Sequence, residues 1–318
     1  SYTQAIALKP DYAEAHYNLG ITLQELGRLD EAEASYTQVI ALKPDYAEAY
    51  SNLGNTFQEQ GRLEEAEASY TQAVALKPDY AEAHNNLGTT LQELGRLDEA
   101  EASLRQALAL KPDYAEAYSN LGNSLQELGR LDEAEASYTQ AVELKHDYAE
   151  AHYNLGIALQ ELGRLNEAEA SHMQAIELKP DYAEAYNNMG SALQDKGDLE
   201  SAIDSYKQAI NIDPDFAEAY YNMSLVNLSL QDFEAGWPLY EWRWKLIKVY
   251  SNPLKSSKPL WIPSNKQRIL LWCEQGVGDE IMLASLIPDL YSSSLKLIVL
   301  TDKRLIPLFR RSFPDDID

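Results

Sequence analysis

The hexapeptide PDYAEA recurs along this chain at intervals of 34 residues, and this fixed interval limits the folds that the sequence can adopt. It starts at residues 10, 44, 78, 112 and 180, appears as PDFAEA at 214, and has histidine in place of proline at 146. A Leu-Gly pair, an alanine, a tyrosine and a proline also return in most periods. Such a period predicts a solenoid of stacked units, each of which needs its neighbours to bury a core.

Each period contains two patterns of small and apolar residues at helical spacing. One pattern runs from Tyr50 to Phe57 and another from Ala66 to Ala73, with Gly61 between them. Residues three and four positions apart share one helix face, so each unit is predicted to be a helix–turn–helix. Gly61 and its equivalents are expected to end the first helix, where a left-handed residue is favoured.

The sequence also predicts how these helices begin. Asp11 with Glu14, and Asp30 with Glu33, have the spacing of a capping box, in which the first side chain accepts a free N–H group and the glutamate reaches back. Equivalent residues return in the other units, with Asn166 in place of the second aspartate in one of them. We therefore expect side-chain caps at both helices of each unit.

These features together resemble the tetratricopeptide repeat (TPR) family. Counted from Ala47, the large residue, the Leu-Gly pair, the aromatic residues, the alanines and the proline fall where that family has them. The resemblance implies an all-α, right-handed superhelical solenoid. Residues 1–12 correspond to the second helix of a truncated repeat, and a degenerate seventh unit is expected at 217–250. Six full units are predicted at 13–46, 47–80, 81–114, 115–148, 149–182 and 183–216.

The chain's excess negative charge lies on the repeats. Residues 1–216 hold 14 Lys and Arg against 39 Asp and Glu, whereas the remaining 102 residues are balanced. Such an acidic surface repels phosphate backbones, which argues against nucleic acid as a partner and favours neutral or basic proteins. A simpler explanation of the acidity is that glutamate is a good helix former on a solvated face.

Cysteine and histidine usage narrows the chemistry further. The single cysteine, Cys273, rules out a disulfide framework and fits a reducing compartment, so a cytoplasmic location is expected, and no apolar run is long enough to span a membrane. His16, His84 and His152 stand two units apart from one another and cannot converge on one metal. We interpret these histidines, and His172 in a tyrosine position, as packing residues and expect no metal site.

An asparagine stands one residue before the Leu-Gly pair in all seven units. In the TPR family this part of the first helix lines the inner surface of the superhelix, and O-linked N-acetylglucosamine transferase has a similar asparagine ladder that holds extended peptides. The resemblance therefore implies a peptide-binding role, because a primary amide pairs with backbone groups without recognising side chains. The alternative is amplification of a tolerated residue. The column consists of Asn18, Asn52, Asn86, Asn120, Asn154, Asn188 and Asn222.

The repeat pattern decays after residue 217. Trp237, Trp242 and Trp244 crowd the last unit, where they are expected to cover the end of the array or to contact the next domain. A proline- and serine-rich linker is predicted at 251–266, followed by an α/β segment at 267–318. In that segment, two apolar runs at 268–273 and 295–300 predict strands, and an amphipathic stretch at 281–290 predicts a helix between them.

The sequences GWPLYEWRW and ILLWCEQGVGDEIMLASLIPDL are similar to those of bacterial TPR proteins fused to a heptosyltransferase-like glycosyltransferase domain of the GT-B type. That resemblance implies that Gly278 and Asp279 match a Gly-Asp pair in which the aspartate is the general base. The simpler alternative for Asp279 is a first-turn acid at a helix N-terminus. In GT-B enzymes a second half binds most of the nucleotide-sugar, so we expect no cofactor in this chain, no turnover by it alone, and a nucleotide-sugar in a longer parent.

Three functions remain open from the sequence. The first is a scaffold that binds a protein or an extended peptide through its concave surface. The second is a glycosyltransferase whose repeats present the acceptor. The third is a structural protein that self-associates end to end.

Overall fold

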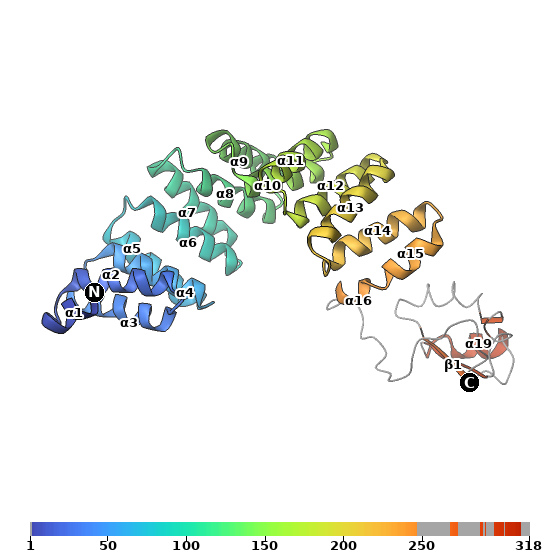
Figure 1. Ribbon diagram of the computed structural model, residues 1–318, viewed down its shortest axis with the longest axis horizontal. Helices are drawn as coiled ribbons and strands as arrows, with labels where there is room; N and C mark the ends of the chain where they lie inside the picture. The colour runs from blue at the N-terminus through green and yellow to red at the C-terminus, as the bar shows by residue number, and fades with distance from the viewer. Residues whose placement is uncertain are drawn as a thin grey trace.

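The computed structural model describes residues 2–246, 268–272, 287–288, 290, 296–301 and 303–312. Residues 2–246 form a continuous series of antiparallel helices stacked into an arch (Figure 1). The predicted helix–turn–helix solenoid is therefore confirmed. Its helices are α1 Tyr2–Leu8, α2 Ala13–Glu25, α3 Leu29–Leu42, α4 Ala47–Glu59, α5 Leu63–Leu76, α6 Ala81–Glu93, α7 Leu97–Leu110, α8 Ala115–Glu127, α9 Leu131–Leu144, α10 Ala149–Glu161, α11 Leu165–Leu178, α12 Ala183–Lys196, α13 Leu199–Ile212, α14 Ala217–Ser229, α15 Phe233–Tyr240 and α16 Arg243–Leu246.

The turn between the two helices of a unit is closed by glycine, as predicted. Gly61 has a φ of 73°, and the N–H of Arg62 donates to the carbonyl of Phe57 at 2.8 Å. A left-handed residue followed by this reverse bond is the Schellman arrangement, which satisfies carbonyl groups that the helix leaves free. The same φ region recurs at the equivalent glycines from Gly27 to Gly197.

The predicted capping boxes are wrong at both helices of the units. The first helices, such as α2 with Tyr12 as its N-cap, have no side-chain cap. The second helix α3 begins one residue before Asp30, and its N-cap is Arg28, which makes no side-chain cap. Arg28 instead pairs with Glu31 in the first helical turn, at 2.6 Å. Asp30 is likewise a first-turn acid, favoured by the helix dipole. Side-chain caps occur where the arginine is replaced by aspartate, at Asp198 and Asp232.

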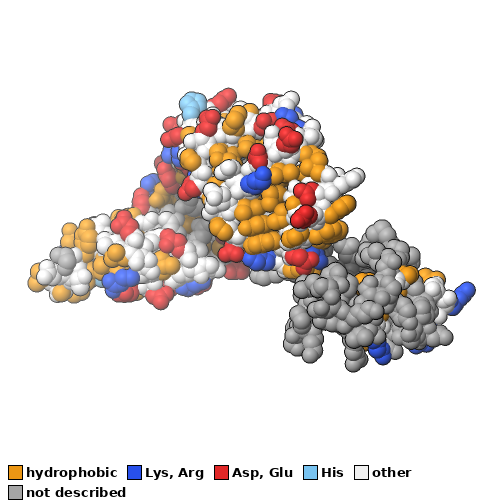
Figure 2. All heavy atoms as spheres, turned by 45° about the vertical axis from the view of Figure 1, so that its right-hand side comes forward, with side chains coloured by type: hydrophobic (Ala, Val, Ile, Leu, Met, Phe, Trp, Pro, Cys, Tyr) orange, Lys and Arg blue, Asp and Glu red, His pale blue; other side chains and the backbone are white. Residues whose placement is uncertain are grey.

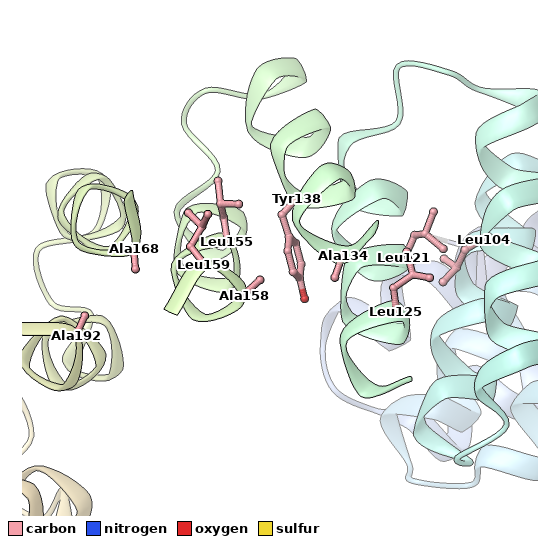
Figure 3. Packing of buried hydrophobic residues seen from close by; sticks show 10 residues of the cluster. All are labelled: Leu104, Leu121, Leu125, Ala134, Tyr138, Leu155, Ala158, Leu159, Ala168 and Ala192. Carbon is pink, nitrogen blue, oxygen red and sulfur yellow. The ribbon is translucent and has the colours of Figure 1, made fainter. Parts of the chain in front are cut away.

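The core runs along the array as a seam of buried clusters, each of which spans neighbouring units. In five of the six full units an aromatic ring from the second helix, such as Tyr70 or Tyr138, is almost fully buried against the first helix. Glycine is required opposite this ring, because a Cβ on Gly54 would lie 2.7 Å from Cε1 of Tyr70. Figure 3 shows the seam from Leu104 on α7 to Ala192 on α12, with Tyr138 at its centre. Each unit thus shares its core with its neighbours, as the repeat period predicts.

The first helices form the inner layer of the arch. In its middle, α6, α8 and α10 lie on the inner side and α7, α9 and α11 on the outer side (Figure 1). Successive first helices also contact one another more extensively than successive second helices do. The inner surface of the curve is therefore built from α2, α4, α6, α8, α10, α12 and α14.

The last unit ends in aromatic contacts. Trp242 stacks on Tyr220 with ring centroids 3.8 Å apart, and the Nζ of Lys245 lies 3.8 Å from the Trp242 ring centre. Trp242 thus covers part of the end of the array. Trp237 differs, because 55% of it is exposed.

In the C-terminal segment, β1 (Arg268–Trp272) pairs in parallel with β2 (Lys296–Leu300), in the register Arg268↔Lys296. Both strands were predicted, and a parallel pair requires a crossover connection. Ile287 and Leu297 are buried against the following helix α19 (Ile306–Ser312) through Phe309. Only three residues of the predicted intervening helix, 287, 288 and 290, belong to the described part, and all three are helical. No helix among the described residues is both long enough and apolar enough to cross a membrane.

Candidate functional site: the asparagine column of the inner face

All seven predicted asparagines are the sixth residue of their first helix, and all are partly exposed. They are neither scattered over the outer wall nor fully packed into the core. From the second unit onward, the amide Nδ2 donates to a side chain on the preceding first helix. The column is therefore a set of crosslinks between successive first helices. These bonds are Asn52 to Tyr17 Oη (2.9 Å), Asn86 to Asn55 Oδ1 (3.0 Å), Asn120 to Asn85 Oδ1 (3.0 Å), Asn154 to Asn123 Oδ1 (3.1 Å), Asn188 to Tyr153 Oη (3.0 Å) and Asn222 to Asn187 Oδ1 (3.0 Å).

The acceptors of these bonds come from two positions on the preceding helix. Where the residue just before the asparagine is tyrosine or asparagine, that residue accepts, as Tyr17 and Asn85 do. Where it is the shorter serine, an asparagine one helical turn later accepts instead, and this residue is Asn55 or Asn123. The two positions thus compensate for each other, so every unit offers one acceptor to the next.

The carbonyl side of the column is largely unused. In the described structure, Oδ1 of Asn52, Asn120, Asn154 and Asn222 receives no hydrogen bond, whereas Oδ1 of Asn86 and Asn188 accepts from the neighbouring asparagine. Asn18 lies on α2, which is the earliest first helix among the described residues, so no pairing with a preceding one is seen for it. The Nδ2 bonds therefore fix the orientation of each side chain and leave four carbonyl oxygens available as acceptors.

A second polar row follows the C-terminal ends of the first helices. In the first five full units this glutamine donates to an acid of the next unit, as Gln58 does to Glu93 at 2.7 Å and Gln126 does to Glu161 at 2.6 Å. The buried tyrosine closes the network, because Tyr70 Oη donates to Gln58 Oε1 at 3.1 Å. Burial raises the pKa of Tyr70, so this hydroxyl keeps its proton at neutral pH.

The histidines do not form a site. His16, His84 and His152 each place a ring nitrogen near a backbone carbonyl of the preceding loop. His172 is fully buried beneath Gly156, neither ring nitrogen has a hydrogen-bond partner, and burial lowers the pKa of His172 to about 4. Among the residues with described positions, no group of three His, Cys, Asp or Glu side chains could hold a metal.

Two features were not anticipated from the sequence. One is the asparagine acceptor that accompanies each serine. The sequence does contain this signal, because Ser51 is followed by Asn55 and Ser119 by Asn123, four residues later in each case. The unpaired state of His172 needed the structure. The predicted general base Asp279, together with Gly278 and Cys273, lies outside the described residues.

Figure 2 shows the array from one side, with Asp and Glu side chains distributed over the repeats and hydrophobic side chains gathered on the C-terminal part of the arch. Exposed large hydrophobic residues of that part are Leu225, Leu230, Phe233 and Trp237.

One known protein is similar to this chain in sequence, and two solved structures are similar to it in fold. Protein FlbA of Caulobacter vibrioides is 32% identical over 104 residues, which are 29% of this chain and only 16% of FlbA. The structure of the APC/C hetero-tetramer Cut9–Hcn1 is similar with a TM-score of 0.62 and 19% identity, over 71% of this chain and 45% of that one. The structure of PilF from Pseudomonas aeruginosa is similar with a TM-score of 0.59 and 20% identity, over 70% of this chain and 96% of that one. At these identities the two structures support the fold alone.

The family comparison is more extensive. Overlapping matches described as tetratricopeptide repeat cover residues 11–79, 45–113, 79–147 and 113–181, and a further match covers 173–204. A match described as TPR repeat covers residues 190–231. Together with the helical hairpins and the shared seam, these matches show that the chain belongs to the tetratricopeptide repeat family.

Proposed function

We propose that the inner face binds an extended segment of a partner protein, and that the free asparagine carbonyls accept backbone N–H groups of that segment. Every residue except proline offers such a donor, so this mode of binding holds a chain without recognising its side chains. The guest is expected to be neutral or basic, since the surrounding repeats are acidic.

The main support is the division of labour within each amide. Asn120 and Asn154 donate Nδ2 to the preceding unit and leave Oδ1 partly exposed and without a donor. The oxygens are also held in place by the donor bonds, so little side-chain entropy is lost when a guest binds.

The experiment begins with a random dodecapeptide library displayed on phage and selected on the wild-type chain. Affinities of the selected peptides are then measured for a triple variant with Asn52→Ala, Asn120→Ala and Asn154→Ala. Loss of three hydrogen bonds is expected to weaken binding at least about tenfold. The helix content, followed by circular dichroism, should stay unchanged.

A matched control separates binding from repeat geometry. Asn154→Ala and Asn123→Ala delete the same 3.1 Å bond between the fourth and fifth units, but only Asn154→Ala removes a free carbonyl. Asn123→Ala also removes one acceptor of the Tyr138 hydroxyl, which keeps Gln126 Oε1 as its other acceptor. We expect Asn154→Ala to weaken binding more than Asn123→Ala, and Asn166→Ala on the exposed second helix to have no effect. If every selected peptide binds the triple variant as tightly as the wild type, the asparagine column has no role in binding.

For the C-terminal segment we infer a second candidate, the opening of a heptosyltransferase-like glycosyltransferase domain. The parallel pairing of β1 and β2 favours it, because such a pair is typical of the Rossmann-like halves of these enzymes. Asp279 would be the general base, and a nucleotide-sugar would be bound by a longer product of the gene. In such a product, Asp279→Asn should lower sugar transfer without weakening nucleotide-sugar binding. Equal transfer rates for the two forms would contradict the assignment.

A further inference from the structure

The two positions that flank the asparagine column change in polarity from unit to unit. One stands directly before the asparagine and the other three residues after it. Both lie beside the column on the inner face, because each accepts a column Nδ2 in some units, as Tyr153 does from Asn188 and Asn123 does from Asn154. The pairs are polar in four units and join an aromatic to an aliphatic residue in three. The polar pairs are Ser51 with Asn55, Asn85 with Thr89, Ser119 with Asn123 and Asn187 with Ser191, and the others are Tyr17 with Ile21, Tyr153 with Ile157 and Tyr221 with Leu225.

The bonds between units do not explain an aliphatic residue at the second position. Where the first position supplies the acceptor, as Asn85 and Asn187 do, the second position needs no acceptor and is Thr89 or Ser191. Small polar residues are therefore compatible with the fold at this position. An isoleucine or a leucine that is open to solvent there must have another reason.

Ile157 and Leu225 keep apolar surface open on the inner face. Ile157 is partly exposed, and Leu225 is 36% exposed. The equivalent Ile21 differs, because it packs against the buried cluster that contains Tyr36, and this contact accounts for it in the first unit. Single exposed apolar residues are common on proteins. These two share one position of the repeat, however, and both stand beside the asparagine column.

The same two units also have a free asparagine carbonyl. In the described structure, Oδ1 of Asn154 and of Asn222 receives no hydrogen bond, whereas in the sixth unit between them Oδ1 of Asn188 accepts from Asn187. Residues three positions apart share one face of a helix. The fifth and seventh units therefore each offer an acceptor for a backbone N–H and, next to it, an apolar surface for a side chain.

The tyrosine of each pair is held by a second ring. The centroid of Tyr153 lies 4.9 Å from that of Tyr182, and the centroid of Tyr221 lies 5.7 Å from that of Tyr240. The aliphatic side chain follows each tyrosine by one helical turn, so ring and aliphatic chain form a continuous surface. Because the rings are already packed, little side-chain entropy is lost when this surface is covered.

We propose that the fifth and seventh units each bind one bulky apolar side chain of the guest, against Ile157 and against Leu225. This inference rests on the proposed peptide binding and specifies its guest. Packed helices lie about 8–10 Å apart, so two first helices separated by one unit place these surfaces about 16–20 Å apart. An extended chain advances about 3.3 Å per residue, so the two anchors are about five or six residues apart in the guest.

Two variants give these units the residues of their polar counterparts. Ile157→Asn introduces the residue type of Asn123, and Leu225→Ser introduces that of Ser191. Neither aliphatic side chain can form a hydrogen bond, so all bonds of the column are kept. The matched control is Met173→Asn, which removes an apolar side chain that is 50% exposed on the outer helix α11 of the fifth unit.

The probes are dodecapeptides selected on the wild-type chain, together with copies in which one bulky apolar residue is replaced by Ala. Binding is measured by fluorescence anisotropy as a double-mutant cycle, which compares two peptides on the same variant, so that a change in stability does not imitate the effect. The selected peptides should share two bulky apolar residues about five or six positions apart. Each Ala copy should bind the wild type about tenfold more weakly.

Ile157→Asn should remove most of the loss for one anchor and Leu225→Ser most of the loss for the other, while Met173→Asn changes neither. The losses should persist at high salt, because burial of apolar surface is not screened. Asparagine and serine occupy this position in other units, so both variants should unfold in urea close to the wild-type midpoint. Weaker binding at unchanged stability separates a guest surface from a packing role.

The outcomes separate the two proposals. If the selected peptides lack the paired apolar residues, or if each Ala copy loses as much affinity on the variants as on the wild type, these units do not hold the anchors, while binding through the asparagines stands. If instead the triple asparagine variant binds every peptide as tightly as the wild type and only Ile157→Asn and Leu225→Ser weaken binding, the anchors stand and the asparagine contacts fall. A library that yields no binding peptide overturns both.

Discussion

The fourth and fifth units are closely similar in sequence but differ at the centre of the second helix, where one has Tyr138 and the other His172. The hydroxyl of Tyr138 donates to Asn123 Oδ1 at 2.8 Å and to Gln126 Oε1 at 3.0 Å. His172 is equally buried and has no hydrogen-bond partner, and the residue at the position of Asn123 is Ile157.

The difference shows that a repeated column cannot be interpreted alone. A polar ring in this core is satisfied only where a neighbouring side chain accepts its proton, as Asn123 and Gln126 do for Tyr138. Leaving a buried polar group unpaired costs about 1–3 kcal/mol. The junction beside His172 is therefore expected to be the weaker of the two, and in a solenoid such a weak unit limits the cooperativity of the array.

The largest expected effect is the loss of stability on removing the Tyr138 ring, whose hydroxyl is hydrogen-bonded. Tyr138→Ala leaves a cavity and should lower the free energy of unfolding by about 3–5 kcal/mol. His172→Ala should lower it by clearly less, because the lost ring is smaller and made no hydrogen bond. Urea unfolding followed by circular dichroism measures both, with the exposed Thr71→Ala as the control for a neutral surface change. Equal losses from the two core variants would contradict the comparison.

A somewhat smaller effect should appear on acidification. Burial lowers the pKa of His172 from 6.5 to about 4, so the unfolded chain binds the proton more readily than the folded one. The stabilising contribution of the neutral ring is complete above pH 6.5 and is lost as the pH falls toward 4. At pH 4 and below, the resulting loss in the free energy of unfolding amounts to about 3 kcal/mol.

His172→Tyr provides the reference for this measurement, since other groups titrate in the same range. Tyr36, Tyr70, Tyr138 and Tyr206 occupy this position in four other units and each donate to a glutamine. The difference in unfolding free energy between the variant and the wild type should grow as the pH falls from 6.5 to 4. A constant difference across that range would show that His172 is not kept neutral by burial.

Much of the fold could be predicted from the sequence. The 34-residue period, the Leu-Gly pair and the glycine at each turn were enough for the hairpins, the seam and the left-handed turns, because these depend on local patterns that every unit repeats. The two C-terminal strands followed from their apolar runs. Helix starts were predicted less well. Asp30 was expected to be the N-cap of the second helix, but the N-cap is Arg28.

The candidate site was predicted only in part. The position of the asparagine column on the inner helices was expected. That its Nδ2 groups bond between units was not, because those bonds depend on residues 31 or 35 positions away. Whether the column holds a guest stays a prediction.

The central claim is that asparagine carbonyls on the inner face accept backbone N–H groups of an extended guest. The most direct measurement is a backbone N-methyl scan of one selected peptide, in which each amide N–H is replaced in turn while every side chain is kept. We expect losses of about tenfold at a few spaced positions, and these losses should disappear on the variant with Asn52→Ala, Asn120→Ala and Asn154→Ala. Uniform affinity along the scan, or the same pattern on the variant, would contradict the claim.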